Sequence, residues 1–259
     1  MQEQTGSGEG RGRLAVIIGG ANGIGAATAR CLAGHGWQVA VADLDEAAAH
    51  ETARHCGGQA YAVDVRDAES IEHTAQAIEA RQGPVFALVS AAAIFAPRMA
   101  PEKLPVADWD RIVSIGYRGT YLCNVAFAQR MARQGAGAIV NIASMVGQRP
   151  NHGHAYYSAK AAVNMLTEGM AGEWGRSGVR VNAVSPGFVA VPRMLDNIRD
   201  GQRYAVSPAE VSALGRLVEP AEVAETIAFL LSDRASAITG ANLACLLYTS
   251  PSPRDVEES

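Results

Sequence analysis

Short apolar segments alternate with longer helical patterns along almost the whole chain, and this alternation constrains the fold more than any other feature. Seven segments have the length and apolar character of buried strands: LAVII, QVAVA, QAYAV, FALVS, GAIVNI, VRVNAV and ANLAC. Between them, apolar residues recur at intervals of three and four, as on amphipathic helices, over 26–33, 68–80, 109–131, 155–174 and 220–231. The pattern predicts an α/β fold in three layers, with a doubly wound, seven-stranded parallel sheet and at least six helices.

The length of the chain matches one such unit. Its 259 residues are enough to bury about three quarters of the unfolded surface without disulfides or metals. No repeat or Pro- and Gly-rich linker interrupts the alternation, so a second domain has no place to begin. We expect a single domain over residues 14–245, preceded by a polar, flexible arm at 1–13 and followed by an atypical tail at 246–259.

Charge and cysteine content exclude several classes of function. The net charge of −4 comes without a basic stripe, so we expect no nucleic-acid partner. The four cysteines lie far apart, without a CxxC pair or a histidine at a metal-ligand spacing, which indicates reduced thiols and no metal site. No segment of the sequence resembles a signal peptide, and no apolar run approaches the length of about 20 residues that a membrane span needs. We therefore expect a cytoplasmic protein with no membrane partner.

A glycine-rich turn follows the first predicted strand. Gly19, Gly23 and Gly25 lead into a helix, so backbone N–H groups and the positive end of that helix can face a pyrophosphate. Their spacing differs from the common G-x-G-x-x-G pattern, and a glycine-rich turn alone also occurs without any ligand. The turn indicates a dinucleotide site, with simple turn chemistry as the alternative.

An acidic residue ends the second predicted strand. Asp43 lies about 20 residues beyond the glycines, where a carboxylate can accept both hydrogen bonds of an adenosine ribose diol. Its charge would repel the 2′-phosphate of NADP, so the sequence favours NAD. The alternative is structural, because Asp43 or Asp45 could instead cap the helix that begins at Glu46.

Five motifs occur in the order found in one enzyme family. They are IGGANGIG, VDV at 63–65, IVNIAS, YYSAK and NAVSPGFV, and together they span about residues 14–244. In these motifs the chain resembles the short-chain dehydrogenases/reductases. The resemblance implies a Rossmann fold and a nicotinamide-dependent oxidoreductase that acts on a small-molecule alcohol or ketone. It also implies a homo-oligomer, a tetramer or a dimer, paired through the two long helices at 109–131 and 155–174.

Three residues are the candidate catalytic group. Tyr156 and Lys160 lie one helical turn apart, so a phenol and an ammonium share one helix face. The ammonium favours the phenolate, which allows Tyr156 to take the proton of an alcohol. Ser144 ends the fifth predicted strand, where its hydroxyl can hold the substrate oxygen, or simply bond to backbone as most serines do. Tyr157 is a rival base or a packing residue, but it lacks a lysine at this offset.

The resemblance also implies which residues hold the cofactor. Lys160 would hold the nicotinamide ribose, Asp64 and Val65 would border the adenine, and Pro186 and Gly187 would flank the nicotinamide. No metal is expected. The full set of predicted cofactor-binding residues is Gly19, Asn22, Gly23, Ile24, Gly25, Asp43, Leu44, Asp64, Val65, Ala91, Ala92, Tyr156, Lys160, Pro186, Gly187 and Val189.

The chain departs from the family pattern at several places. Ile18, Ser90 and Val191 replace the usual Thr, Asn and Thr, and Gly116 replaces an Asn that holds a water between the lysine and solvent. These losses keep open a protein that binds the nucleotide without turnover, although Ser, Tyr and Lys are all retained. From about Leu246 the tail resembles translated adapter DNA instead of the family's Asp-Gly-Gly turn.

The segment expected to cover the substrate is polar. Residues 191–217 include Arg193, Arg199, Arg203 and Tyr204, which favours a sugar, a polyol or a similar small polar alcohol. Reduction of a 3-oxoacyl thioester or a steroid ketone is the alternative, although acyl-carrier reductases generally prefer NADPH, against Asp43. His152 and His154 precede Tyr156 and either donate to substrate hydroxyls or are merely solvated.

Overall fold

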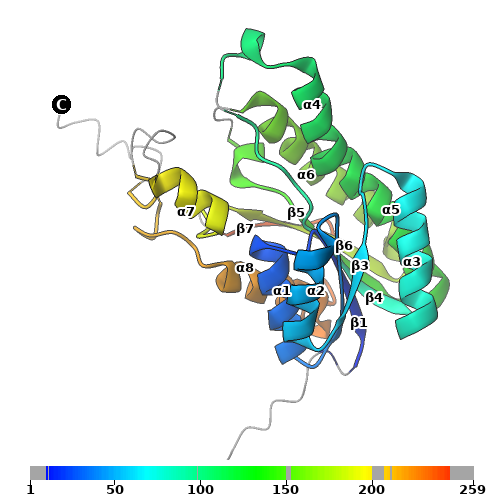
Figure 1. Cartoon of the computed structure of the whole chain (residues 1–259). Coiled ribbons are helices and arrows are strands. Elements are labelled where there is room, and N and C mark those ends of the chain that lie inside the picture. Colours follow the sequence, from blue (N-terminus) through cyan, green and yellow to red (C-terminus); the bar gives the residue numbers. More distant parts are fainter. Residues whose placement is uncertain are drawn as a thin grey trace, which may run out of the picture.

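A computed structural model describes residues 10, 12–97, 99–149, 153–199, 207–210 and 212–245. Its centre is one parallel sheet of seven strands in the order β3-β2-β1-β4-β5-β6-β7, which confirms the predicted fold class (Figure 1). Each of the seven apolar segments supplies one strand. The bounds are β1 Leu14–Ile18, β2 Gln38–Asp43, β3 Gln59–Ala62, β4 Val85–Ser90, β5 Gly137–Ile142, β6 Val179–Pro186 and β7 Asn242–Cys245.

The central strands are apolar throughout because helices cover both faces of the sheet. Every residue of β1 is buried, and its side chains alternate between two cores. Ala15 and Ile17 belong to the core on one face of the sheet, whereas Val16 and Ile18 belong to the core on the other face. A continuous apolar strand thus supplies both cores with the period of two that a pleated strand imposes.

The helices form the two outer layers (Figure 1). One layer holds α1, α2 and α8, and the other holds α3, α5 and α6, while α7 lies over the carboxyl ends of the strands. Among the described residues, no helix is both long and apolar enough to cross a membrane. The bounds are α1 Gly23–Gly34, α2 Glu46–Cys56, α3 Ala68–Gln82, α4 Val106–Val113, α5 Gly119–Gln134, α6 His154–Trp174, α7 Pro192–Arg199 and α8 Pro220–Leu231.

The helix predicted over 109–131 forms as one unbroken helical run, but it is not α-helical throughout. A π-helical turn at Ser114–Arg118 joins α4 to α5. π turns are rare and occur mostly as single turns at functional sites. Gly116 lies buried inside this turn, and its backbone oxygen accepts a 3.1 Å hydrogen bond from the Thr120 hydroxyl. That side-chain bond satisfies a backbone carbonyl within the irregular turn.

The strand order places a crevice at one edge of the sheet. The order reverses between β1 and β4, so the connections that follow these strands leave in opposite directions. In open α/β sheets, ligands bind in the crevice that this reversal opens at the carboxyl ends of the strands.

The end of the predicted arm is tied down beside β1, because the Gly10 N–H donates to the His35 backbone oxygen at 2.9 Å. The tail at 246–259, His152, Arg203 and Tyr204 lie outside the described residues.

Candidate active site

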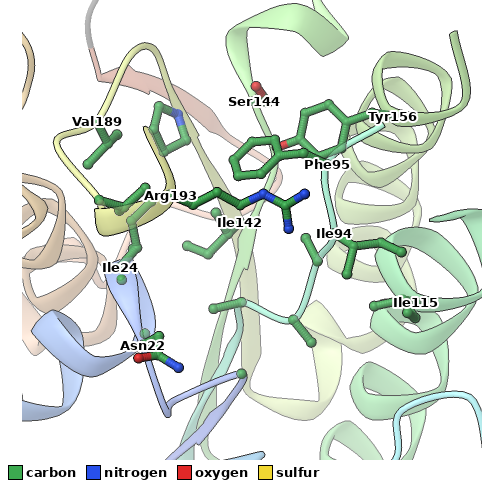
Figure 2. Close-up of a pocket in the computed structure, with 18 of the residues that line it drawn as sticks. Asn22, Ile24, Ile94, Phe95, Ile115, Ile142, Ser144, Tyr156, Val189 and Arg193 are labelled. Atoms are coloured by element: carbon green, nitrogen blue, oxygen red, sulfur yellow. The ribbon is translucent and has the colours of Figure 1, made fainter. Parts of the chain in front are cut away.

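A cavity of about 750 Å³ lies at the carboxyl ends of the strands. This volume lies within the range of small-molecule and cofactor sites. Figure 2 shows Asn22 and Ile24 at one end, Ser144 and Tyr156 at the other, and Arg193 between them. Every residue predicted for the site lines this cavity: Gly19, Asn22, Gly23, Ile24, Gly25, Asp43, Leu44, Asp64, Val65, Ala91, Ala92, Ser144, Tyr156, Lys160, Pro186, Gly187 and Val189.

The glycine-rich turn brings three backbone segments into close approach. Gly19 has a φ of +79°, and a Cβ atom on it would lie 2.5 Å from the backbone nitrogen of Ala92. A Cβ on Gly25 would lie 2.1 Å from the Gly19 oxygen. Asn22 precedes α1 without a side-chain cap bond, and no acidic residue lies in the first turn. The N–H groups at this helix end therefore face the cavity in a form that suits the pyrophosphate of a dinucleotide.

Asp43 does not cap a helix. Asp45 is the N-cap of α2, because its side chain accepts a hydrogen bond from the Ala48 N–H at 3.1 Å. The Asp43 carboxylate is half-buried at the cavity, where Oδ2 accepts from the Ala21 N–H at 3.0 Å and Oδ1 from the Asp45 N–H at 3.1 Å. The structural alternative for Asp43 was therefore wrong, and its carboxylate supports the glycine-rich turn.

The residues predicted beside the adenine follow β3. Val65 is buried against Gly119, and a Cβ atom added to Gly119 would lie 2.9 Å from the Val65 side chain. The Asp64 carboxylate forms an ion pair with Arg66 at 2.6 Å, and this bond lowers the pKa of the carboxyl group. The sequence does not predict Arg66, which lines the cavity as well.

The candidate catalytic side chains meet at the other end of the cavity. Ser144 lies two residues past the end of β5 and is 8% exposed. Tyr156 and Lys160 come from the first two turns of α6, as their spacing predicts. The Tyr156 phenol lies next to Ser144, and the Lys160 Nζ lies 5.7 Å from the centre of the Tyr156 ring. The three groups that proton transfer needs are therefore adjacent.

Burial shifts the protonation of both titratable groups. It raises the pKa of Tyr156 to about 12, and the hydrogen bond with Ser144 offsets only part of that shift. It lowers the pKa of Lys160 to about 8, because a buried ammonium loses its hydration. At neutral pH the phenol thus keeps its proton, and the ammonium remains charged. The pair can release a proton only when further positive charge stabilises the phenolate.

Tyr157, the rival base, forms a hydrogen bond with His154. The Tyr157 hydroxyl lies 3.0 Å from Nδ1 of His154, and neither residue lines the cavity. His154 lies close to Tyr156 in sequence because it begins α6, but its ring bonds to Tyr157 and not to Tyr156. The geometry supports Tyr156, and not Tyr157, as the proton-transfer residue.

Two departures from the family pattern have visible consequences. At Gly116 an added Cβ would meet only the Ala159 Cβ, at 3.9 Å, so the missing side chain leaves room beside α6. Ser90 joins a buried amide network, since Asn124 Nδ2 lies 3.3 Å from its hydroxyl and 2.8 Å from the side-chain oxygen of Asn141. This network ties β4, α5 and β5 together directly beneath the site, and satisfied buried networks of this kind rigidify a fold.

The sequence does not predict most of the apolar wall near Tyr156. The Phe95 ring lies 5.2 Å from the Tyr156 ring, measured between centres. The sequence does contain a signal for Phe95, because this residue follows Ala91 and Ala92 in the loop after β4, at the edge of the sheet where ligands bind. Ile115 comes from the π-helical turn, which no sequence pattern indicates. The apolar lining residues not predicted as site residues are Val63, Ala93, Ile94, Phe95, Ile115, Ile142, Ala143, Val146, Phe188, Val191, Pro192 and Met194.

A second group of polar side chains lies apart from this cavity. Cys31 and His35 stand one turn apart on α1, and with Glu225 of α8 they bring one potential metal-ligand atom each within 4.8 Å. The expectation that no histidine has a metal-ligand spacing overlooked this pair. None of the three residues lines the cavity.

Comparison with known proteins places the chain in a family. Residues 19–245 match the sequence profile of a family described as enoyl-(acyl carrier protein) reductase. The cis-4-hydroxycyclohexanecarboxylate dehydrogenase of Sinomonas cyclohexanicum is 40% identical, over 90% of this chain and 94% of that protein. The D-threitol dehydrogenase of Mycolicibacterium smegmatis is 37% identical, over 90% of each chain. The chain belongs to the short-chain dehydrogenase/reductase family.

Solved structures share this fold. A short-chain type dehydrogenase/reductase from Mycobacterium marinum superposes with a TM-score of 0.82 at 30% identity, over 90% of this chain and 93% of that one. The crystal structure described as ribose-5-phosphate isomerase from Brucella melitensis 16M superposes with a TM-score of 0.88 at 44% identity. The match covers 90% of this chain and 91% of that one. As a short-chain dehydrogenase/reductase, the chain is an oxidoreductase that uses a nicotinamide cofactor, NAD or NADP. The glycine-rich turn and its open helix end fit such a dinucleotide.

Proposed function

We propose that this short-chain dehydrogenase/reductase oxidises a secondary alcohol on a small polar molecule and uses NAD as its cofactor. The observation that carries the proposal is the group of Ser144, Tyr156 and Lys160 at one end of a dinucleotide-sized cavity, with Ser144 and Lys160 buried and Tyr156 partly buried. A protein that only senses the nucleotide has no need for a buried ammonium next to a phenol. Burying a charge costs free energy, which supports a catalytic purpose.

Each residue of the group has a distinct role in this proposal. Ser144 holds the substrate oxygen through its hydroxyl, next to the Tyr156 phenol. Tyr156 takes the alcohol proton during oxidation and returns it during reduction. Lys160 supplies positive charge that lowers the pKa of the phenol, and it holds the nicotinamide ribose. When bound, the nicotinamide accepts or donates the hydride.

The choice of NAD rests on Asp43. Its carboxylate is fixed at the cavity by the N–H groups of Ala21 and Asp45, so it cannot swing away from a ligand without losing two hydrogen bonds. A ribose diol can donate to such a carboxylate, whereas a 2′-phosphate would be repelled. Arg66, which lines the cavity beside the predicted adenine residues, is paired with Asp64.

The substrate class rests on the relatives and on the cavity wall. The two relatives named above are dehydrogenases of a polyol and of a hydroxycycloalkane carboxylate. The wall around Tyr156 combines apolar side chains, such as Phe95 and Ile115, with the cation of Arg193. A small alcohol with one apolar face and one polar end suits this wall.

Reduction of a ketone is the second candidate. The apolar wall of Ile94, Phe95 and Phe188 favours it, since a 3-oxoacyl chain or a steroid would bury hydrocarbon there. Asp43 disfavours the NADPH-dependent form of this reaction. A nucleotide-binding protein without turnover is the third candidate, and Gly116 is the residue that supports it.

The proposal includes a homo-oligomer, a tetramer or a dimer. Large apolar side chains are exposed on neighbouring helices: Val106 and Trp109 on α4, Tyr121 on α5 and Met165 on α6. Exposed apolar residues clustered on one face mark a protein interface.

A cytoplasmic location is also proposed, because all four cysteines are described and none forms a disulfide.

Steady-state assays test the proposed function. Polyols, hydroxycycloalkane carboxylates and hydroxysteroids are each offered with NAD and with NADP, and the matching ketones with NADH and NADPH. We expect turnover of a small polar alcohol with NAD. Measurable NADH binding with no turnover of any compound would overturn the enzymatic proposal, and higher kcat/KM with steroids or with NADP would select the second candidate.

A further inference from the structure

The charged side chains that line the cavity are almost all bonded to a protein partner. Lys160 donates to the backbone oxygen of Ile142, Arg66 pairs with Asp64, and Asp196 pairs with Arg199. Asp43 accepts two backbone N–H groups. Arg193 differs from them. Among the residues that the structure describes, no carboxylate lies within salt-bridge distance of its guanidinium.

Arg193 reaches toward the catalytic end of the cavity. It lies in the first turn of α7, and Figure 2 shows its side chain extending across the cavity toward Phe95 and Ile94. The guanidinium carbon is 5.8 Å from the centre of the Phe95 ring, which is itself 5.2 Å from the Tyr156 ring. One aromatic ring thus separates the guanidinium from the phenol. A small molecule can span that distance.

The surroundings of this guanidinium favour an anion over a neutral polar group. Apolar side chains such as Ile94 and Ile115 line the cavity on this side, and the one carboxylate of α7 that lines it, Asp196, is paired with Arg199. A guanidinium matches the two oxygens of a carboxylate in geometry, and such charge-assisted bonds are about twice as strong as neutral ones. Arg193 is exposed, so solvent screens part of this attraction until a ligand covers the guanidinium.

We infer that Arg193 is an anion-binding residue that selects substrates with a carboxylate at the end opposite the reacting hydroxyl. The substrate hydroxyl lies at Ser144 and Tyr156, the hydrocarbon body lies against Phe95, and the carboxylate pairs with the guanidinium of Arg193. This inference rests on the proposed function and narrows its substrate class from small polar alcohols to hydroxycarboxylates. A neutral polyol would leave the guanidinium without an anion.

The cofactor also carries anions, and its pyrophosphate is the other ligand that Arg193 could contact. The two ligands share the chemistry of a guanidinium–oxyanion pair but predict different measurements. If the substrate supplies the anion, loss of Arg193 affects only substrates with a carboxylate. If the pyrophosphate supplies it, loss of Arg193 weakens NADH binding and slows all substrates to the same extent.

The test compares two substrates that differ in charge and hardly in shape, cis-4-hydroxycyclohexanecarboxylate and the corresponding carboxamide. The variants are Arg193→Gln, which removes the charge, and Arg193→Lys, which keeps it. Arg176→Gln is the control, because Arg176 is exposed beyond the far end of α6. We expect Arg193→Gln to lower kcat/KM for the carboxylate by about 10- to 100-fold, the range for a charge-assisted hydrogen bond, with less than about threefold change for the carboxamide. Arg193→Lys should restore part of the loss.

A binding measurement separates this inference from the proposed function. Cyclohexanecarboxylate has no hydroxyl to oxidise, so its affinity for the protein–NADH complex is measured by calorimetry without turnover. Tighter binding to wild type than to Arg193→Gln, by about tenfold or more, supports the inference even if no alcohol is oxidised. Equal binding to both, or a rise in the NADH Kd of Arg193→Gln with equal losses for carboxylate and carboxamide, overturns it.

Discussion

The Nζ of Lys160 donates a 2.6 Å hydrogen bond to the backbone oxygen of Ile142, the last residue of β5. The side chain is only 2% exposed and has no carboxylate partner in the part of the chain that the structure describes. A carbonyl therefore takes the place of a counter-ion. Such a partner fixes the position of the ammonium without neutralising it, which leaves the positive charge available to the neighbouring phenol.

The buried ammonium should reduce stability. Its pKa of about 8 in the folded protein lies below the ordinary value of 10.5, so between these values the unfolded chain binds more protons and stability rises with pH. The cost is fully present below about pH 8 and vanishes above about pH 10.5. We expect Lys160→Met to raise the free energy of unfolding at pH 7 by about 2 kcal/mol, after allowance for the lost hydrogen bond.

Urea unfolding at about pH 7 and about pH 9.5 checks this expectation, since the difference between variant and wild type should shrink at the higher pH. Lys103→Met is the control, because Lys103 is the other lysine of the chain and is exposed. A Lys160→Met protein that is less stable than wild type at pH 7 would show that the site does not strain the fold.

The two adjacent tyrosines should differ sharply in activity. Tyr156→Phe removes the hydroxyl next to Ser144 and should lower kcat by about 100- to 10,000-fold, the range for loss of general acid–base catalysis. Tyr157→Phe removes only the contact with His154 and should leave kcat within about threefold. Fluorescence titration should give the same NADH Kd for both variants. Comparable activity losses in the two would assign the proton to a different group.

Cofactor preference should depend on Asp43 and not on Asp45. Asp43→Ala removes the carboxylate that faces the cavity, so we expect the ratio of kcat/KM for NAD over NADP to fall by at least about tenfold. Asp45→Ala removes the N-cap of α2 and should cost about 1 kcal/mol of stability without changing that ratio. The measurement is a pair of steady-state assays with each cofactor. A ratio that follows Asp45 instead would contradict the proposed role of Asp43.

The glycine-rich turn should not tolerate one added methyl group. A Cβ on Gly25 would lie 2.1 Å from the Gly19 oxygen, so Gly25→Ala must push the turn apart. We expect a rise of at least about tenfold in the NADH Kd and a loss of about 1–3 kcal/mol of stability from overpacking. Gly34→Ala, at the other end of α1 where a Cβ meets nothing within 4 Å, should leave NADH binding unchanged. Intact NADH binding in Gly25→Ala would mean that the turn does not hold the cofactor.

Sequence patterns predict the sheet well because its strands are buried on both faces. All seven apolar segments form strands, and β1 shows why, since both of its faces are covered. The π-helical turn at Ser114–Arg118 is different. The segments on both sides of this turn are α-helical and have apolar residues at intervals of three and four, so the sequence reads as one helix across it.

Within the site, the motif residues are predictable and the substrate wall is not. Gly19, Tyr156 and Lys160 are identified by their spacing together with the order of the five motifs, because their chemistry requires one turn type and one helix face. Two aspartates at the start of α2 fit the same cap, and only the hydrogen bond from Ala48 to Asp45 decides between them. Phe95 reaches the cavity through loop geometry that depends on the packing of the whole domain.

The π-helical turn at Ser114–Arg118 also has a consequence for how this chain can vary. A π turn holds one residue more than an α turn, so it takes up that residue in a wider turn and keeps the helices on its two sides in nearly the same orientation. Ile115 lines the cavity from within this turn, and α4, which precedes it, carries the exposed Trp109. Deletion of a single residue here would therefore convert the π turn to an α turn and change how Ile115 lines the cavity, while α4 and α5 keep their present faces. The cavity wall can thus vary by one residue of length without a change in the outer surface.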